Sequence, residues 1–426
     1  MMKFTVISLG CKVNQFEAQA LGQMMTERGW QRCAAEEGMA DAVLIFTCCV
    51  TNKAAMKSRK TLYHYRRLNP KAIMIMVGCY VQVDSASIPG ADLLVGSSLY
   101  TKIPDLIEQY QKDHQARVVM PSWKDITFED AVPDIFTEQT RAYLKVQDGC
   151  NQYCSYCIIP YARGKERSMP LEEAVAQAGR LSKNHHEIVL TGIHTGRYGY
   201  GKGYTLADLI ERILEQTDIQ RLRISSIEMN EVDAHFIRLL QNPRLGRHVH
   251  MPLQAGCDRI LERMHRPYDT KQYLHKVEEI RKAVPDISLS TDLIVGFPGE
   301  SDADFTQTLA FIDQCAFSFL HVFPFSRRKG TQADIMKEQV NEAVKKRRVH
   351  LAMEKSECLY DAFKRRQIGK ISSVLMEKAH ETYTPGHSSE YVEVHVPGVW
   401  KRGEIFPVRI KKLVDHQLIG EVEMGT

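Results

Sequence analysis

The sequence predicts an α/β protein with an N-terminal parallel α/β sheet domain, a central partial (β/α) barrel of the TIM type and a small C-terminal OB-like β-barrel. Two observations predict this order. Strand-like and helical segments alternate up to about residue 358, and such alternation is typical of parallel sheets covered by helices. From Gly369 to Thr426, short strands are separated by turns, with no room for a helix of any length. A chain of 426 residues is long enough for two or three domains.

The N-terminal domain is expected to span residues 1–112, with three strands at about 3–9, 42–46 and 72–77 and helices at about 14–28 and 52–68. A cysteine follows each of the three strands: Cys11, Cys48 and Cys79. Ligands of open parallel sheets bind at the carboxyl ends of the strands. Isolated cysteines often pack as small hydrophobic residues. Their equivalent positions instead favour three metal ligands that meet at one edge of a sheet.

Residues 113–140 have mixed polarity and no clear period, and they are interpreted as a linker. The central domain, residues 141–366, is expected to contain six strands and intervening helices, as in a partial or complete parallel α/β barrel. The strands are placed at 142–147, 187–190, 221–227, 248–251, 287–295 and 319–323. The β-barrel domain follows at residues 367–426.

Composition excludes a membrane protein and favours a polyanionic partner. The chain is 44% hydrophobic and 25% charged, as in ordinary globular proteins, and it has no apolar run of eighteen or more residues. The N-terminus does not resemble a signal peptide, so a cytoplasmic location is expected. The net charge is only +4, but basic runs gather in the last fifth of the chain, where RNA phosphates could bind. A solvated helix face is the alternative for any single run.

The densest chemical signal is Cys150-Asn-Gln-Tyr-Cys154-Ser-Tyr-Cys157. Cysteines in a reducing compartment are seldom paired, so a cluster of them indicates metal ligands or redox groups. Iron–sulfur clusters normally have four thiolate ligands, and a loop with three would leave one iron of a [4Fe–4S] cluster open to an external ligand. The alternatives are a zinc site with a distant fourth ligand and unrelated core cysteines.

This spacing resembles that of the radical S-adenosylmethionine (SAM) superfamily. The resemblance implies that SAM chelates the open iron and that Tyr156 lies near its adenine. Further SAM contacts are implied at Gly192, at Glu228, and at Asp292 and Gly296 in the segment Asp292-Leu-Ile-Val-Gly296-Phe-Pro-Gly. Each of these short motifs alone is weak, since a Gly-Phe-Pro-Gly segment is usually only a turn. Their positions at successive strand ends of one barrel strengthen one another.

Three N-terminal motifs resemble those of the methylthiotransferases, a radical SAM family: Ser8-Leu-Gly-Cys11-Lys-Val-Asn-Gln15, Thr47-Cys48-Cys49-Val-Thr51 and Val77-Gly-Cys79. The C-terminal barrel resembles the RNA-binding TRAM domain. The resemblance implies a second [4Fe–4S] cluster on Cys11, Cys48 and Cys79, and the replacement of C–H by C–SCH3 using two SAM molecules. Position 49 is a cysteine where the family has another small residue, so Cys48 and Cys49 compete. The Thr-Cys-x-Val-Thr motif favours Cys48.

Three substrate branches of the family are considered. Pro160-Tyr-Ala-Arg-Gly164 and the segment His250–Asp258 resemble the branch that acts on N6-threonylcarbamoyladenosine at position 37 of tRNA. The other two branches act on N6-isopentenyladenosine in tRNA and on an aspartate of a ribosomal protein. The rivals outside the family are a biotin- or lipoate-synthase type of enzyme and a zinc-containing RNA-binding adaptor.

The expected partners are the anticodon loop of tRNA, a reducing electron donor such as flavodoxin, and a sulfur donor. The barrel could follow RNA phosphates with its basic residues and stack bases on its aromatic residues. Its aromatic candidates are Tyr383, Tyr391 and Trp400, and its basic ones are Lys401, Arg402, Arg409, Lys411 and Lys412. Arg163, Lys165 and Arg167 could reach substrate phosphate or face solvent, and Arg263, Arg266 and Tyr268 could face the active site.

Overall fold

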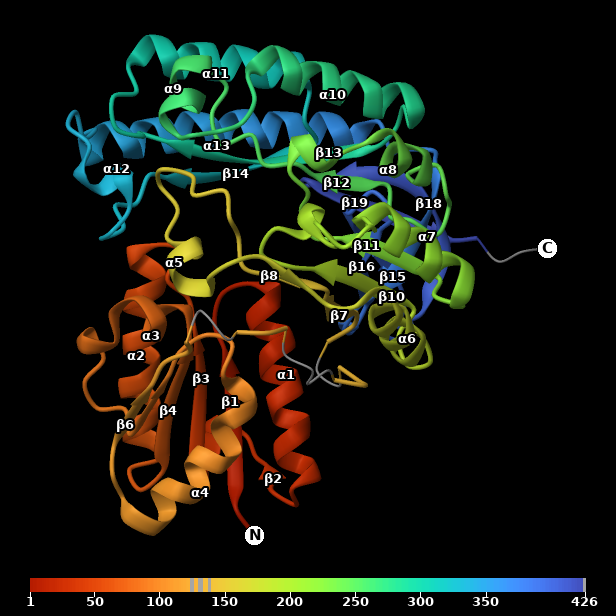
Figure 1. The fold of residues 1–426 in the computed structure, drawn as a ribbon. Coiled ribbons are helices and arrows are strands. Elements are labelled where there is room, and N and C mark those ends of the chain that lie inside the picture. The colour runs from red at the N-terminus through yellow and green to blue at the C-terminus, as the bar shows by residue number, and fades with distance from the viewer. Residues whose placement is uncertain (123–125, 129–132, 137–138, 424–426) are drawn as a thin grey trace. The chain divides into compact units, whose positions relative to one another are not determined.

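The computed structural model describes residues 1–122, 126–128, 133–136 and 139–423, and its chain divides into two compact units (Figure 1). The expected linker lies partly outside the described residues. The first unit comprises Met1–Asp134, Lys145–Met169 and Ser326–Asp334, and the second comprises Ile135–Leu144, Pro170–Phe325 and Ile335–Thr426.

The first unit contains a six-stranded parallel sheet in the order β2-β1-β3-β4-β5-β6. The three expected strands are β1 (Lys3–Ser8), β3 (Ala42–Thr47) and β4 (Ile73–Gly78), which are neighbours. Three more strands have only two or three residues, too few to show a hydrophobic period. They are β2 (Gln31–Arg32), β5 (Leu93–Val95) and β6 (Arg117–Val119), the last of which falls in the range expected to be linker.

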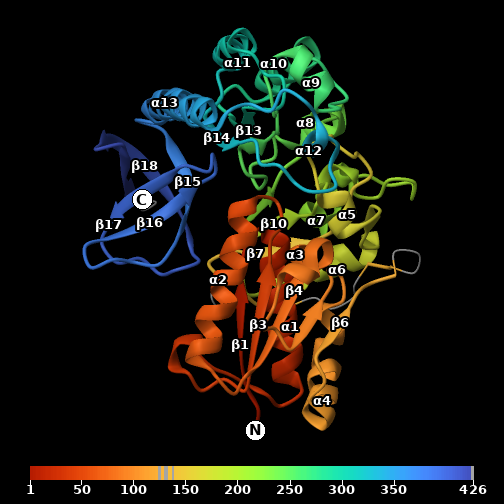
Figure 2. The ribbon, with the colours of Figure 1, turned by 90° about the vertical axis from the view of Figure 1, so that its left-hand side faces the viewer.

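Helices cover both faces of this sheet (Figure 2). Because successive residues of a strand point to opposite faces, Leu44 and Ile75 pack against α1 (Lys12–Glu27) and α4 (Ile103–Asp113). Val43 and Met74 on the other face pack against α2 (Asn52–Leu68) and α3 (Cys79–Asp84). Burial on both faces explains why these strands are apolar throughout. Short 3-10 helices connect the elements: η1 (Ala35–Glu37), η2 (Ser85–Ser87) and η3 (Tyr100–Lys102).

The segment Lys145–Met169 belongs to the first unit although it follows the first strand of the central domain. It contains β8 (Gln147–Asp148), α5 (Ile159–Arg163) and β9 (Arg167–Ser168), and β8 pairs antiparallel with β9. Ile158 and Ala162 pack into the core with Val43 and Ile45 of the sheet. Hydrophobic burial therefore fixes this segment against the N-terminal sheet.

The second unit holds the barrel strands as two three-stranded sheets, β11-β10-β7 and β12-β13-β14. Their bounds are β7 (Ala142–Lys145), β10 (Glu187–Thr191), β11 (Arg221–Ile224), β12 (His248–His250), β13 (Ser288–Val295) and β14 (Phe319–Pro324). The α/β alternation predicted from the sequence is confirmed. The intervening helices are α6 (Leu171–Ser182), η4 (Thr195–Arg197), α7 (Leu206–Gln216), η5 (Met229–Glu231), α8 (Ala234–Leu239), α9 (Asp258–Arg263), α10 (Thr270–Ala283) and α11 (Asp302–Cys315).

A long helix, α13 (Glu342–Arg365), connects the barrel strands to the C-terminal domain; the short α12 (Gln332–Ile335) precedes it. The Ser356 hydroxyl donates to the carbonyl of Leu320 in β14 at 3.1 Å and accepts from its N–H at 2.9 Å. Phe363, near the end of α13, lies in the core of the C-terminal barrel. The helix thus packs on both parts of the second unit.

The last domain is a closed five-stranded barrel in the order β15-β16-β17-β19-β18, as predicted. Its strands are β15 (Ile371–Met376), β16 (Tyr383–Ser388), β17 (Glu393–Pro397), β18 (Ile405–Val414) and β19 (Gln417–Val422). Closure leaves no free strand edge. Valines from four of the strands, among them Val374, Val394 and Val408, fill its core.

A buried carboxylate fixes this barrel to the rest of the second unit. Glu187 in β10 pairs with Arg141, Arg221 and Arg223. Arg221 also donates to the Ser373 carbonyl at 2.8 Å. The arginines therefore satisfy the carboxylate and main-chain carbonyls of the barrel together, as buried charges require.

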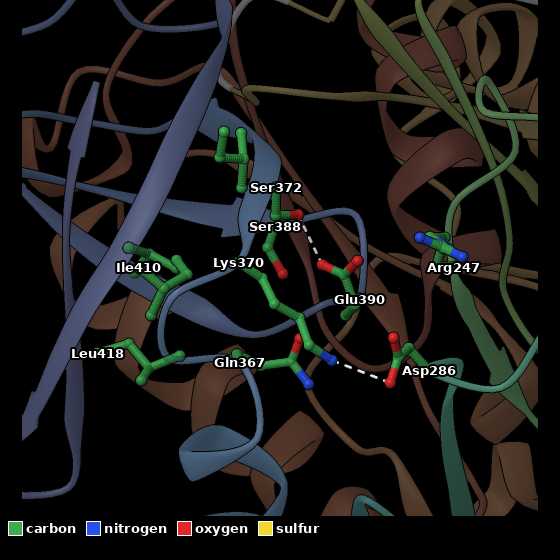
Figure 3. A pocket seen from close by; sticks show the side chains of 11 residues that line it. Arg247, Asp286, Gln367, Lys370, Ser372, Ser388, Glu390, Ile410 and Leu418 are labelled. Atoms are coloured by element: carbon green, nitrogen blue, oxygen red, sulfur yellow. Dashed lines mark hydrogen bonds and ion pairs between the residues drawn. The ribbon is translucent and has the colours of Figure 1, made fainter. Parts of the chain in front are cut away.

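A cavity of about 40 Å³ lies beside this contact (Figure 3). Lys370 pairs with Asp286 at 2.9 Å, and Ser372 donates to Glu390 at 2.6 Å. Such a volume holds at most a few waters, so the cavity belongs to the joint between barrel and strands. No helix among the described residues is long and apolar enough to cross a membrane.

Candidate functional site: two sets of three cysteines

The sheet places the three N-terminal cysteines at one edge. Cys11 is the N-cap of α1, Cys48 directly follows β3, and Cys79 is the first residue of α3 after β4. Since β1, β3 and β4 are parallel neighbours, their carboxyl ends lie together. Gly10 packs against Cys48, with an ideal Cβ on Gly10 only 3.2 Å from the Cys48 sulfur. The structure therefore brings these three residues together, as the sequence predicted.

Cys48 and Cys49 have different surroundings. Cys49 is fully buried in the core between the sheet and α2, whereas Cys48 is half-buried beside Gly10. Partial burial raises the pKa of the Cys48 thiol to about 11. The Cys49 thiol lies against the Cys79 sulfur, and this hydrogen bond, with the Arg163 charge after it, lowers the pKa of Cys79 to about 7 despite burial. The geometry favours Cys48 as the third ligand and Cys49 as a donor to a ligand.

The second set of cysteines lies on a loop that starts after β8. Gly149 has φ +73°, and an added Cβ would meet the Lys165 carbonyl oxygen at 2.0 Å, so glycine is required. Cys150 N–H donates to the Gly164 carbonyl at 3.1 Å and closes the base of the loop. Gln152 N–H donates to the Cys150 sulfur at 3.4 Å. All three sulfur-bearing residues, Cys150, Cys154 and Cys157, are half-buried.

Both sets fit an iron–sulfur cluster. Each supplies three thiols, the ligand type that iron–sulfur clusters use, and leaves room for a ligand from outside the chain. N–H and S–H donors next to the sulfurs, such as Gln152 and Cys49, are a common second layer around such ligands. All six cysteines belong to the first unit.

Three of the five residues predicted to contact SAM follow barrel strands. Tyr156 is half-buried on the cysteine loop of the first unit, and the other four lie in the second. Gly192 follows β10, Glu228 lies beyond β11, Asp292 lies within β13 and Gly296 follows β13. The carboxyl ends of β10, β11 and β13 thus carry Gly192, Glu228 and Gly296, as expected for this type of barrel, whereas Asp292 lies in the middle of β13.

Two of these side chains are held by other residues of the second unit. Glu228 pairs with Arg266, whose guanidinium also donates to the Tyr268 hydroxyl at 2.8 Å. Asp292 lies 3.3 Å from His250 Nε2. A carboxylate oxygen of Asp292 and ring nitrogens of His250 and His321 all lie within 4.8 Å of one another. These pairs fix both carboxylates in place.

Gly296 has a steric role. Its φ is +74°, and an added Cβ would lie 2.4 Å from Cγ of Lys345 in α13. Its N–H donates to Glu300 at 2.6 Å, and Glu300 is itself paired with Arg348 at 2.6 Å. Only glycine allows α13 to approach this turn.

The expectation that Arg163 reaches phosphate or solvent is wrong. Its side chain is 0% exposed. It donates to Cys79, Asn14 and Glu17. Arg167 lies nearby and pairs with Asp148 at 2.8 Å. Sequence analysis missed this buried network altogether, because basic residues next to a loop usually face solvent and no pattern marks a buried arginine.

Aromatic residues of the C-terminal barrel differ in accessibility. Tyr391 stacks on His248 at 5.0 Å and is part of the joint with the barrel strands. Trp400 packs against Phe406 at the barrel core. Tyr383 stacks between two histidines of the domain's own surface, His380 at 4.7 Å and His395 at 4.4 Å.

Several basic residues of this domain already have partners. Arg409 pairs with Glu423, Lys411 with Glu421 at 3.1 Å, and Lys401 with Glu404 at 2.8 Å. Arg402 donates to the Thr140 hydroxyl at 3.0 Å, and Lys412 is exposed.

This chain is similar to known proteins along most of its length. The family model of the radical SAM superfamily matches residues 144–312, and that of "Uncharacterized protein family UPF0004" matches residues 3–96. The protein named threonylcarbamoyladenosine tRNA methylthiotransferase MtaB from Bacillus subtilis (strain 168) is 38% identical, over 95% of this chain and 93% of its own. The MtaB of Aquifex aeolicus (strain VF5) is 35% identical, over 96% and 100%. A tRNA-2-methylthio-N(6)-dimethylallyladenosine synthase from Moorella thermoacetica is 33% identical, over 89% and 88%.

The solved structure of TsrM from Kitasatospora setae, a radical SAM methyltransferase with cobalamin and a [4Fe–4S] cluster bound, has the same fold. The TM-score is 0.60 at 14% identity, over 79% of this chain and 77% of that one. The resemblance inferred from the cysteine motifs is thus confirmed over nearly the whole chain, and the protein belongs to the methylthiotransferase family of radical SAM enzymes.

Proposed function

We propose that this protein is an enzyme that methylthiolates N6-threonylcarbamoyladenosine at position 37 of tRNA, converting C2–H to C2–SCH3. One SAM serves as methyl donor and a second as source of a radical. The observation that carries the proposal is the placement of two three-cysteine sets in one folded unit, each suited to a [4Fe–4S] cluster. A C–H bond without an acidic proton cannot be opened by acid–base catalysis, which explains why a radical is needed.

The chain's own residues have distinct roles in this proposal. Cys150, Cys154 and Cys157 hold the cluster that binds and cleaves SAM, with Tyr156 next to the adenine. Cys11, Cys48 and Cys79 hold the second cluster, at which sulfur is supplied. The protein positions these groups and the substrate, while the cofactors perform the bond cleavage.

The SAM contacts proposed in the second unit are Gly192, Glu228, Asp292 and Gly296. The Glu228–Arg266 and Asp292–His250 pairs hold both carboxylates in fixed rotamers. Fixed side chains support a preorganised binding site.

The C-terminal barrel is proposed to act as a TRAM-type RNA-binding domain. Its surface stack of His380, Tyr383 and His395 offers an aromatic face to a base, and the exposed Lys412 offers a charge to phosphate. The tRNA anticodon loop is the proposed partner. A reducing electron donor such as flavodoxin and a sulfur donor complete the reaction.

The substrate is supported by the names of the relatives with 35–38% identity. The relative from Moorella thermoacetica, at 33%, carries the name of the dimethylallyladenosine branch. Nucleoside mass spectrometry of tRNA separates the two. Deletion of the gene should abolish the methylthio form of threonylcarbamoyladenosine alone, and plasmid-borne wild type, but not Cys154→Ala, should restore it. Loss of methylthio-isopentenyladenosine instead, or unchanged tRNA, would refute the assignment.

A further inference from the structure

Arg163 is the centre of a buried ionic network that contacts one N-terminal cysteine directly. Its Nε–H donates to the Cys79 sulfur at 3.0 Å. Its Nη1 and Nη2 groups lie 2.5 and 3.1 Å from the two carboxylate oxygens of Glu17, and Nη2 donates to the Asn14 amide oxygen at 2.9 Å. The arginine reaches this place from α5, directly after the loop with Cys150, Cys154 and Cys157. One side chain therefore connects the two cysteine sets.

The same network of side chains also hydrogen-bonds to the backbone beside each set of cysteines. Asn14 donates to the carbonyls of Leu9 and Thr47 at 2.6 and 2.9 Å, two residues before Cys11 and directly before Cys48 in the chain. Asp148 accepts from the N–H of Gly149 at 2.8 Å, directly before Cys150. Arg163 lies 3.3 Å from Asp148. The backbone that positions each set is thus bonded to the same group of side chains.

The charged side chains of this network do not balance by themselves. Lys145 pairs with Glu17 at 2.7 Å and with Asp148 at 2.9 Å, and Arg167 pairs with Asp148 at 2.8 Å. The three cations and two carboxylates leave one positive charge. Burial disfavours any such net charge. The guanidinium of Arg163 directs its Nε–H at the Cys79 sulfur, which a bound cluster would hold as a thiolate ligand.

We propose that Arg163 is a positioning residue that tunes the N-terminal cluster by hydrogen-bonding to its Cys79 ligand, and so raises the reduction potential of that cluster. The inference rests on the ligand set of the proposed function. Hydrogen bonds to cluster sulfurs and nearby charge set the potentials of iron–sulfur clusters. A guanidinium that donates to a ligand stabilises the form with one more electron, because that form carries more negative charge.

The electron balance of the reaction shows why this matters. The SAM-derived radical removes a hydrogen atom from the substrate, and the carbon radical that remains forms a bond to a methylthiolate sulfur, whose methyl group comes from the other SAM. This bond formation leaves one electron over, and a [4Fe–4S] cluster held by Cys11, Cys48 and Cys79 would be the acceptor next to that sulfur. Arg163 makes this acceptor easier to reduce.

Redox titration followed by electron paramagnetic resonance tests the proposal. In full-length protein with Cys150, Cys154 and Cys157 replaced by alanine, the electron paramagnetic resonance signal comes from the N-terminal cluster alone. Arg163→Gln should shift its midpoint potential to a more negative value. Arg163→Lys, which keeps the charge but loses the Nε–H, should give a smaller shift in the same direction. Arg167→Gln is the matched control: it removes a cation of the same network at Asp148 without touching Cys79, and it should shift the potential much less than Arg163→Gln does.

Each result has one meaning. If the protein with Cys150, Cys154 and Cys157 replaced and Arg163 intact binds no iron, the proposed ligand set is wrong. The proposed tuning role of Arg163 is then wrong as well. If iron binds but Arg163→Lys keeps the wild-type potential, or Arg167→Gln shifts it as far as Arg163→Gln does, Arg163 is merely structural. Should Arg163→Gln not fold, Arg163→Lys and Arg167→Gln alone decide between these outcomes.

Discussion

Gly10 lies so close to Cys48 that a Cβ on Gly10 would be 2.8 Å from the Cys48 Cβ. The φ of Gly10 is also +98°, a conformation that side chains rarely adopt. We predict that Gly10→Ala displaces Cys48 and abolishes the N-terminal cluster. The measured iron content should fall from about eight to about four atoms per chain.

Gly29→Ala is the control for this variant. Gly29 has φ +82°, but nothing lies within 4 Å of its added Cβ. The backbone strain of about 1 kcal/mol is then the only cost, and both clusters should remain. Equal iron loss in both variants would contradict a steric role for Gly10.

Replacement of the adjacent cysteines should give opposite results. Cys48→Ala should lose the N-terminal cluster, because its thiol is the one that lies by Gly10 and Cys11. Cys49→Ala should keep both clusters, with a stability cost of about 1 kcal/mol for a small cavity. Iron and sulfide analysis of the two purified variants distinguishes them, and loss of iron in Cys49→Ala alone would assign the ligand to Cys49.

Acid should weaken the joint between the two parts of the second unit. Although partial burial opposes ionisation, the hydrogen bond from His387 and the charge of Arg141 lower the pKa of Glu377 to about 2, from an ordinary 4.5. A lowered folded-state pKa stabilises the fold above the ordinary value, and this contribution is lost as pH falls toward 2. The melting-temperature difference between wild type and Glu377→Gln should therefore shrink between pH 4.5 and 2. Glu381→Gln, at an exposed residue, is the control, and a difference independent of pH would contradict the prediction.

Tyr383 should contribute to tRNA binding by supporting the exposed ring of His380, because histidines cover both of its own faces. Alanine substitution of a stacked aromatic residue costs about 1–3 kcal/mol per base, so Tyr383→Ala, which removes the support of the His380 ring, should raise the tRNA dissociation constant roughly 5- to 150-fold. Tyr63→Ala, at an exposed tyrosine of α2, should leave it unchanged. Fluorescence anisotropy with labelled tRNA measures both, and equal affinities would exclude Tyr383 from the RNA contact.

The sequence predicts those parts of the fold that have a hydrophobic period. The long strands β3 and β4, the helices α2 and α13, and the turn-rich β-barrel all occur where expected. The strands β2, β5 and β6 could not be predicted, because two or three residues show no period and only pairing with a neighbour makes them strands.

The cysteines of the candidate site could be predicted from the sequence, whereas the charged residues that surround them could not. Cysteines stand out because their spacing follows the chemistry of the metal. Arg163 and Glu17 lie 146 positions apart and meet only in the folded chain, so their pairing has no local signal. The membership of residues 145–169 in the first unit is likewise decided by tertiary packing of Ile158 and Ala162.

The first unit also includes Ser326–Asp334, where Arg328 bonds to Asn52 and the Ala333 N–H donates to the Ser155 carbonyl at 2.8 Å. During synthesis, therefore, the nascent chain presents all six cysteines long before the unit that holds them is complete. At 5–20 residues per second, the ribosome needs on the order of ten seconds to pass from residue 169 to residue 334. Iron delivered in that interval would meet the six cysteines in a unit that still lacks its last segment.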